Sequence, residues 1–255
     1  MIWICLTAFG ASMLTFFAGF GLGTLLMPVM ALFFPIQDAI AITACVHLFN
    51  DFFKASLIGK HANKKVLLRF GLAAFIFSFL GAKLLSATSH LPPIIEYFIG
   101  GHVFEIIPVK IVISILIIVF TLIELIPHLH KFTVRAKYLT IGGALSGFFG
   151  GFSGHQGALR SMFLSKLKLS KEAFIGTSAM IAVLIDVSRL IGYSTDFRKE
   201  IFYSNSVLIV AAIISAMFGT WIGNHFLKKI TMKAIQKIVA VTLLVFALAL
   251  GVGLI

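Results

Sequence analysis

The chain has 255 residues, of which 60% are hydrophobic and 12% are charged, and its net charge is +12 at pH 7. Ordinary globular domains are about 45–50% apolar and about 25% charged, so this composition excludes a soluble domain and indicates an integral membrane protein. Several apolar runs reach the roughly 20 residues that a helix needs to cross a bilayer. Because these runs lack strand-like alternation, a helical bundle is predicted instead of a β-barrel.

The first half of the chain is predicted to form apolar segments over residues 2–20, 22–34, 36–59, 66–87 and 109–127. The pattern returns over residues 138–153, 155–167, 172–193, 202–227 and 234–254. The pieces 22–34 and 155–167 are too short for an ordinary crossing, so we expect an all-α polytopic bundle of about eight transmembrane helices, with a broken or hairpin helix opening each half. Whether these short pieces re-enter or cross the membrane stays open.

The two halves are related by an internal repeat. AGFGLGTLLMP, which begins at Ala18, matches GGFSGHQGALR, which begins at Gly150, as a Gly-rich break followed by a short apolar piece. NDFFKAS, from Asn50, matches IDVSRLI, from Ile185, because both carry Asp-x-x-Lys/Arg deep in an apolar run. We therefore assign residues 1–127 and 128–255 to two membrane repeats within one membrane domain.

Loop charges predict how the chain crosses the membrane. Short cytoplasmic loops carry an excess of Lys and Arg, and four loops here are basic, through Lys60, Lys64, Lys65, Arg69, Lys131, Arg135, Lys137, Lys166, Lys168, Lys171, Lys228, Lys229 and Lys233. Basic loops next to the lipid bilayer therefore account for the positive net charge. No nucleic-acid partner is predicted. The loop over residues 86–108 carries Glu96 and Glu105 but no Lys or Arg, so it is expected outside.

This topology puts both termini on the non-cytoplasmic side and inverts the second repeat relative to the first. Inverted repeats that each contain a broken helix are a transporter architecture with a site near the bilayer midplane, and one repeat is expected to move against the other.

Glycines mark both breaks. Gly19, Gly21 and Gly23 precede Pro28, and the matching stretch contains Gly150, Gly151, Gly154 and Gly157. Backbone freed from helix geometry is tolerated in a membrane only where it is buried in protein or lines a cavity. The half-helix that follows offers free N–H groups and a positive dipole end, which suits an anion. The alternative is close helix packing through small residues.

Charged residues lie deep in the third segment of each half. His47, Asn50, Asp51 and Lys54 share one helical face, and Asp186 and Arg189 take the Asp51 and Lys54 positions in the second repeat. Ionisable residues at membrane depth usually face a water-filled route or a partner. The alternative is that each Asp-x-x-Lys/Arg is an ion pair that only fixes packing, and Lys54 is near enough to its segment end to reach the interface.

Arg160 follows the second break at the position that Pro28 holds after the first. Its planar guanidinium matches oxyanions and stays charged. His155 and Gln156 lie at the break itself, and His155 can titrate near neutral pH, which suits proton coupling. No nucleophile, nucleotide or metal motif is visible, and Cys5 and Cys45 lie in apolar runs. Neither an enzyme nor a cofactor or metal is therefore predicted.

The chain resembles the TauE/SafE family of sulfite-exporter-like membrane proteins. The resemblance rests on GFGLGTLLMP, on its second copy GGFSGHQGALRS, and on LSKEAFIGTSAMIAVLIDVSRLIGY. SGHQGALR replaces the commoner G-x-G-G-G-x-x-x-x-P of the family, so Arg160 stands where the family usually has proline. The resemblance implies two homologous halves in the inner (plasma) membrane, transport of small sulfur-containing anions such as sulfite, sulfonates or related organosulfur acids, and no cofactor.

The sequence thus predicts a secondary transporter of a small oxyanion. The expected anion-binding residues are Arg160, His155, Gln156, Arg189, Lys54, Asn50, His47, Gly21, Gly23, Gly154 and Gly157. Asp51 and Asp186 are expected to hold the cations in place or, like His155 and His47, to carry a coupling proton. Two alternatives stay open: a non-transporting scaffold with structural ion pairs, and a cation transporter that uses Asp51 and Asp186.

Overall fold

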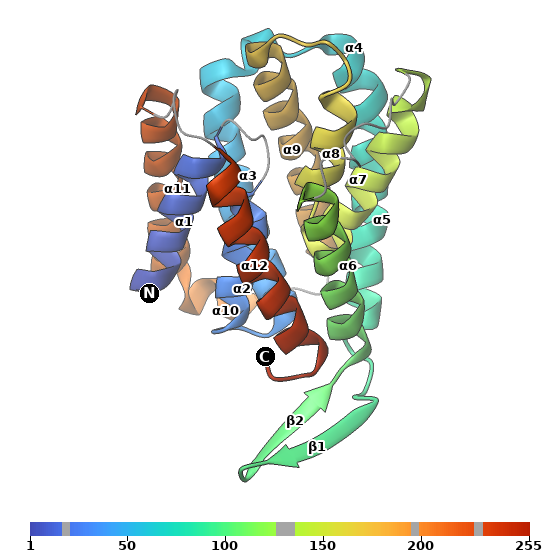
Figure 1. Cartoon of the computed structure of the whole chain (residues 1–255), viewed down its shortest axis with the longest axis vertical. Helices are drawn as coiled ribbons and strands as arrows, with labels where there is room; N and C mark the ends of the chain where they lie inside the picture. The colour runs from blue at the N-terminus through green and yellow to red at the C-terminus, as the bar shows by residue number, and fades with distance from the viewer. Residues whose placement is uncertain (17–20, 126–135, 195–198, 227–231) are drawn as a thin grey trace.

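The computed structural model describes residues 1–16, 21–125, 136–194, 199–226 and 232–255, and most of them are helical (Figure 1). Three described helices are long and apolar enough to cross a membrane, over Lys64–Thr88, Lys171–Tyr193 and Ser206–His225, and shorter apolar helices accompany them. The predicted helical membrane bundle is confirmed at this level. The number of crossings stays a prediction, and Gly19, Lys131, Arg135, Lys228 and Lys229 lie outside the described residues.

The first half contains α1 (Ile2–Thr15), α2 (Leu22–Ala31), α3 (Ile36–Ile58), η1 (Gly59–His61), α4 (Lys64–Val66), η2 (Leu67–Gly71), α5 (Leu72–Thr88) and α6 (Pro108–Leu125). The second half contains η4 (Ala136–Tyr138), α7 (Leu139–Ser153), α8 (Gly157–Leu164), α9 (Lys171–Tyr193), α10 (Lys199–Ser204), α11 (Ser206–Phe226) and α12 (Met232–Gly251). The segment predicted over 202–227 is wrong at its start, because the separate helix α10 ends before α11 begins.

The chain between α5 and α6 forms a β-hairpin, so the all-α prediction is wrong for this segment. β1 (Ile95–Ile99) pairs antiparallel with β2 (His102–Ile106), and the hairpin projects from one end of the bundle (Figure 1). Gly100 and Gly101 have φ angles of +58° and +82°, as a two-residue hairpin turn requires. The signal was present in the sequence, because a Gly pair between two β-branched and aromatic runs favours a hairpin.

Helices of the two halves pair crosswise. α1 packs against α11 and α5 against α7, while α3 packs against α9 and α6 against α12. Each short helix also contacts the long helix that follows it, α2 with α3 and α8 with α9. The set of pairs is symmetric between the halves: the α1–α11 pair corresponds to the α7–α5 pair, and α3–α9 and α6–α12 each pair equivalent helices.

A row of glycines brings α7 against α5. A Cβ atom on Gly143, Gly147 or Gly151 would lie 2.2, 2.1 or 2.0 Å from a backbone carbonyl oxygen of the facing helix. Glycines at every fourth position let two membrane helices approach to backbone contact. Gly219 and Gly223 of α11 meet α1 in the same way. The packing alternative therefore applies to Gly151, one of the glycines before the second break.

The long helices α3 and α9 run antiparallel. The backbone N–H of Asn63, just after α3, donates to Thr177 near the start of α9 over 2.8 Å, whereas His47 in mid-α3 meets Asp186 in the later part of α9. The basic segments that follow α3 and precede α9 therefore gather at one end. In Figure 1 the hairpin and both chain termini lie toward the other end. Which end faces the cytoplasm stays a prediction.

Adding a methyl group to Gly147 should loosen this bundle. The Cβ of Gly147→Ala would overlap the carbonyl oxygen of Ala74, and overpacking of this kind typically costs about 1–3 kcal/mol. We expect a lower midpoint in a thermal unfolding assay of the purified protein in detergent. Gly10→Ala in α1 is the matched control, because nothing lies within 4 Å of its Cβ position, and its midpoint should not fall. Equal midpoints for the two variants would contradict the close α5–α7 contact.

Candidate functional site

The two Gly-rich breaks meet inside the bundle. α7 ends at Ser153 and Gly154 follows with φ +80°, while Gly21 precedes α2 with φ +123°. These positive φ angles are readily adopted only by glycine. A Cβ on Gly23 would lie 3.7 Å from the carbonyl oxygen of Gly154 and 3.4 Å from the ring of His47. The first turn of α2 therefore lies between the second break and the charged residues of α3.

His47 joins the two halves of the chain. Its Nδ1 lies 2.7 Å from a carboxylate oxygen of Asp186 in α9 and 2.9 Å from a carboxylate oxygen of Asp51, one turn further along α3. The Asp residues that the repeat pattern matched thus approach the same imidazole nitrogen. A hydrogen bond or ion pair of this kind is strong in a site from which water is excluded.

Each carboxylate also has a cation on its own helix. Arg189 Nη2 lies 2.7 Å from Asp186, and Lys54 Nζ lies 3.6 Å from Asp51. The second nitrogen of the Arg189 guanidinium, Nη1, donates to the carbonyl oxygen of Gly150 over 3.3 Å. Both predicted Asp-x-x-Lys/Arg ion pairs are therefore present, and Arg189 ties α9 to the end of α7.

Gln156 connects these ion pairs to Arg160. Its side-chain amide donates to Asp186 over 2.9 Å, and its amide oxygen accepts a 2.8 Å hydrogen bond from Arg160. Arg160 also donates from Nε to the hydroxyl of Ser178 in α9 over 2.9 Å. Ser146 fixes the backbone of this segment by donating to the carbonyl oxygen of Gln156.

The whole network is buried. None of its charged residues is more than 7% exposed; they are His47, Asp51, Lys54, Arg160, Asp186 and Arg189. Three of these residues are cations, namely Lys54, Arg160 and Arg189, and two are carboxylates, namely Asp51 and Asp186. The described network therefore has a surplus of one positive charge even when His47 is neutral. A buried surplus charge is costly unless a counter-charge joins it, so the network is suited to receive an anion.

A small pocket opens beside this network. It is lined by Asp51, Lys54, Arg160 and Ser178, together with the apolar residues Phe16, Ile175 and Ala179. It leaves room for about one water molecule. The charged side chains therefore border a small space, and a larger solute needs the helices to move apart.

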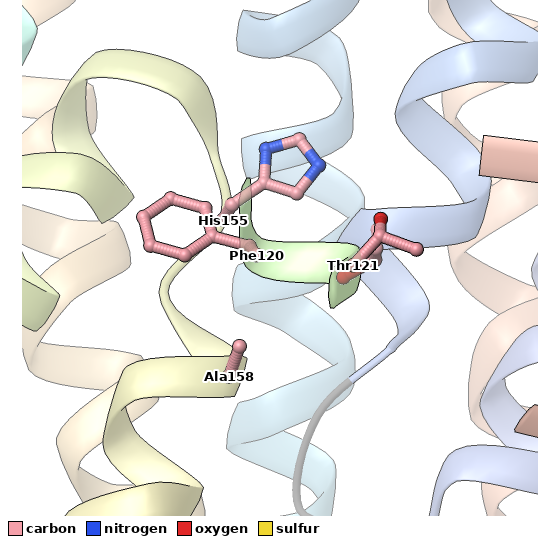
Figure 2. A pocket seen from close by; sticks show the side chains of 5 residues that line it. Phe120, Thr121, His155 and Ala158 are labelled. Atoms are coloured by element: carbon pink, nitrogen blue, oxygen red, sulfur yellow. The ribbon is translucent and has the colours of Figure 1, made fainter. Parts of the chain in front are cut away.

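Two predicted site residues point elsewhere. Asn50 faces α1 and α11, where its amide oxygen accepts hydrogen bonds from Ser12 and Thr220 at 3.0 and 2.6 Å. His155 faces a different pocket, together with Thr121, Phe120 and Ala158 (Figure 2). The structure thus brings Arg160, Gln156, Arg189, Lys54, His47, Asp51 and Asp186 into one network and leaves Asn50 and His155 outside it.

Sequence reasoning missed the hydroxyl groups of the site. Ser178 binds Arg160, and Ser146 holds the Gln156 backbone. Single Ser residues in an apolar helix are common packing residues, so no local pattern separated these two from the rest. Tyr193, whose hydroxyl donates to the carbonyl oxygen of Gly151, was missed for the same reason.

His47, Asp51 and Asp186 also form a possible metal-ligand set, because their ligand atoms lie within 4.8 Å of one another. Neutral imidazole and carboxylates suit several divalent metals. Here, however, Arg189 and Lys54 already pair with the two carboxylates. A cation would have to displace these partners or add its charge to theirs, so the donor set fits a metal poorly.

The apolar helices and the buried charges define a helical membrane protein with a polar network inside its bundle. The chain belongs to the sulfite exporter TauE/SafE family, whose model matches residues 4–250. The members of this family are membrane transporters, and membership implies transport across a membrane. Comparisons with curated proteins and with solved structures found no match. The resemblance noted from the sequence is therefore confirmed.

Removing the charge of Asp186 should destabilise the protein strongly. Asp186→Asn would leave the buried Arg189 guanidinium without its counter-charge, and breaking a buried ion pair from one side typically costs about 3–5 kcal/mol. We expect a large drop in the unfolding midpoint. Glu96→Gln on the exposed hairpin makes the same chemical change and should leave the midpoint unchanged. A midpoint of Asp186→Asn equal to that of the wild type would show that this pair contributes nothing.

Proposed function

We propose that this protein is a secondary transporter of a small oxyanion of the sulfite or sulfonate class. Family membership supports membrane transport and a sulfur-containing anion. The single observation that carries the proposal from the structure is the buried surplus of positive charge beside a small pocket. An anion entering this pocket would neutralise the surplus, whereas a cation would increase it.

The pocket supports a binding mode for such an anion. Lys54 supplies a compact ammonium group and Arg160 a planar guanidinium, two groups that favour oxyanions, and the Ser178 hydroxyl adds a neutral partner. Asp51 also lines the pocket, and its contacts with His47 and Lys54 hold both groups in place. Arg189 and Gln156 do not line the pocket. Arg189 pairs with Asp186, and Gln156 links Asp186 to Arg160 by hydrogen bonds.

We further propose that residues 1–127 and 128–255 are inverted repeats, with both termini outside the cytoplasm. The crosswise pairing and the antiparallel course of α3 and α9 support this arrangement. For the moving units we propose helix pairs in place of the repeats. α5–α7 and α1–α11 each take one helix from each half and touch backbone to backbone at their glycines. We propose that these mixed pairs move as units and open the pocket between them.

The first test is sulfite flux into proteoliposomes. Arg160→Met keeps much of the side-chain volume but removes the charge, so we expect flux to fall about 10- to 100-fold, the kinetic equivalent of losing one charge-assisted interaction. Arg69→Met is the matched control, because Arg69 is exposed on η2. It should leave flux unchanged.

Unfolding midpoints separate the alternatives. A folded Arg160→Met protein with wild-type flux would remove Arg160 from the binding site. A wild type that moves neither sulfite nor sulfonates, but is destabilised by Arg160→Met, would favour a scaffold in which the network only fixes helix packing. Flux of a metal cation that Asp51→Asn abolishes would favour the cation alternative.

A further inference from the structure

A second polar pocket lies on the opposite side of α8 from Arg160. Its lining residues are Thr24, Phe120, Thr121, His155 and Ala158 (Figure 2). Thr24 belongs to the first turn of α2 and Ala158 to the first turn of α8, so both half-helices begin at this pocket. The N-terminus of a helix carries partial positive charge. Two such ends at one pocket favour an anion there.

The proton on His155 is fixed by the backbone. Its Nδ1 lies 2.9 Å from the carbonyl oxygen of Ser153, and a carbonyl oxygen can only accept a hydrogen bond. Nδ1 therefore carries a hydrogen. In the neutral ring the other nitrogen, Nε2, is then a bare acceptor. Nε2 is buried and has no hydrogen-bond partner, and the residue is only 3% exposed.

An oxyanion and this form of His155 do not match. A fully deprotonated oxyanion offers only acceptors, and Nε2 of the neutral ring is also an acceptor. The mismatch disappears when Nε2 takes a proton, because the imidazolium donates from both nitrogens. The pocket can then present a hydrogen-bond donor and a full positive charge to the anion, in addition to the two helix ends.

The charged groups around His155 make the proton and the anion depend on each other. Arg189 of α9 reaches the break, where its Nη1 would lie 3.3 Å from a Cβ on Gly154, and His47 of α3 faces Gly23 beside it. α2 carries no titratable residue, and Arg160 of α8 points to the other pocket. No carboxylate is among the described lining residues; Glu124 of α6 has a side chain outside the described part. Asp186 already pairs with Arg189 and His47, so a second proton on His155 has no counter-charge among the described lining residues until an anion arrives.

We propose that this pocket is a second oxyanion site, filled only together with a proton on Nε2 of His155, so that the transporter couples anion movement to proton movement. The proposal rests on the proposed anion transport. Because binding free energies are reciprocal, the anion tightens proton binding by the same factor by which the proton tightens anion binding. The pocket as it stands leaves no room for a water molecule, so the Phe120 ring, which stacks on the imidazole with centroids 6.3 Å apart, must move for the anion to enter.

Sulfite flux at two pH values tests the coupling. His155→Gln places an amide donor near the Nε2 position that needs no proton. Comparing variant and wild type at the same pH cancels the titration of sulfite itself. We expect the ratio of His155→Gln flux to wild-type flux to rise several-fold from about pH 6 to about pH 8, because only the wild-type site loses its donor. A ratio that stays constant would overturn the proposal.

His225→Gln is the matched control, because His225 is exposed. This variant should keep the wild-type pH profile. A second measurement needs no variant. The ¹⁵N NMR signals of histidine-labelled wild-type protein are recorded while methanesulfonate, a probe anion that stays ionised, is added. We expect one buried ring to change from the Nδ1–H form to the doubly protonated form as the probe is added. The absence of any such change would overturn the proposal even if His155→Gln failed to fold. If the wild type transports sulfite but no histidine signal changes, the proton-coupling proposal is wrong and the proposed function still stands.

Discussion

One ion pair, between His47 of α3 and Asp186 of α9, joins the buried charges of the two central helices and sets how their neighbours pack. A carboxylate inside a bilayer is costly without a partner, and here Asp51 and Asp186 each have a cation on their own helix and share His47 between helices. Sliding one helix along the other would separate His47 from Asp186. The crossing of α3 and α9 is thereby fixed, and Gln156 and Arg189 anchor the second break to it.

The two breaks then have only one place to lie. Their freed backbone must be lined by protein or by a cavity, and they meet beside His47, where Gly23 approaches the Gly154 carbonyl. The half-helices start from this point, so their positive ends and the surplus charge of the network share one region of the bundle. The two pockets follow from this: α8 has Arg160 on one side and Ala158, next to His155, on the other.

The glycine contacts connect stability with motion. α5 and α7 touch through their backbones, as do α1 and α11, and such surfaces have little tolerance for a change in spacing. The central helix α9 also lies close to α5, where a Cβ on Gly192 would lie 2.6 Å from the Cβ of Ala82 and where Ser78 donates to the carbonyl oxygen of Ile185. In the proposed mechanism these close contacts are kept, and the spacing changes at the two pockets.

Local patterns in the chain were enough to predict the membrane class, the positions of the breaks and the Asp-x-x-Lys/Arg pairs, because apolar length, glycine and charge can be read residue by residue. The Gly-Gly hairpin signal was also present in the chain, although the loop was interpreted from its charges alone. Which polar residues meet depends instead on tertiary packing. Asn50 and Asp51 are neighbours, yet one faces α1 and α11 and the other faces α9; His155 and Gln156 are neighbours, yet they serve different pockets. Adjacent side chains in a helix are separated by a turn of about 100°. At a break the backbone angles likewise direct adjacent side chains to different sides. Which residues make contact is therefore set by packing and not by sequence proximity.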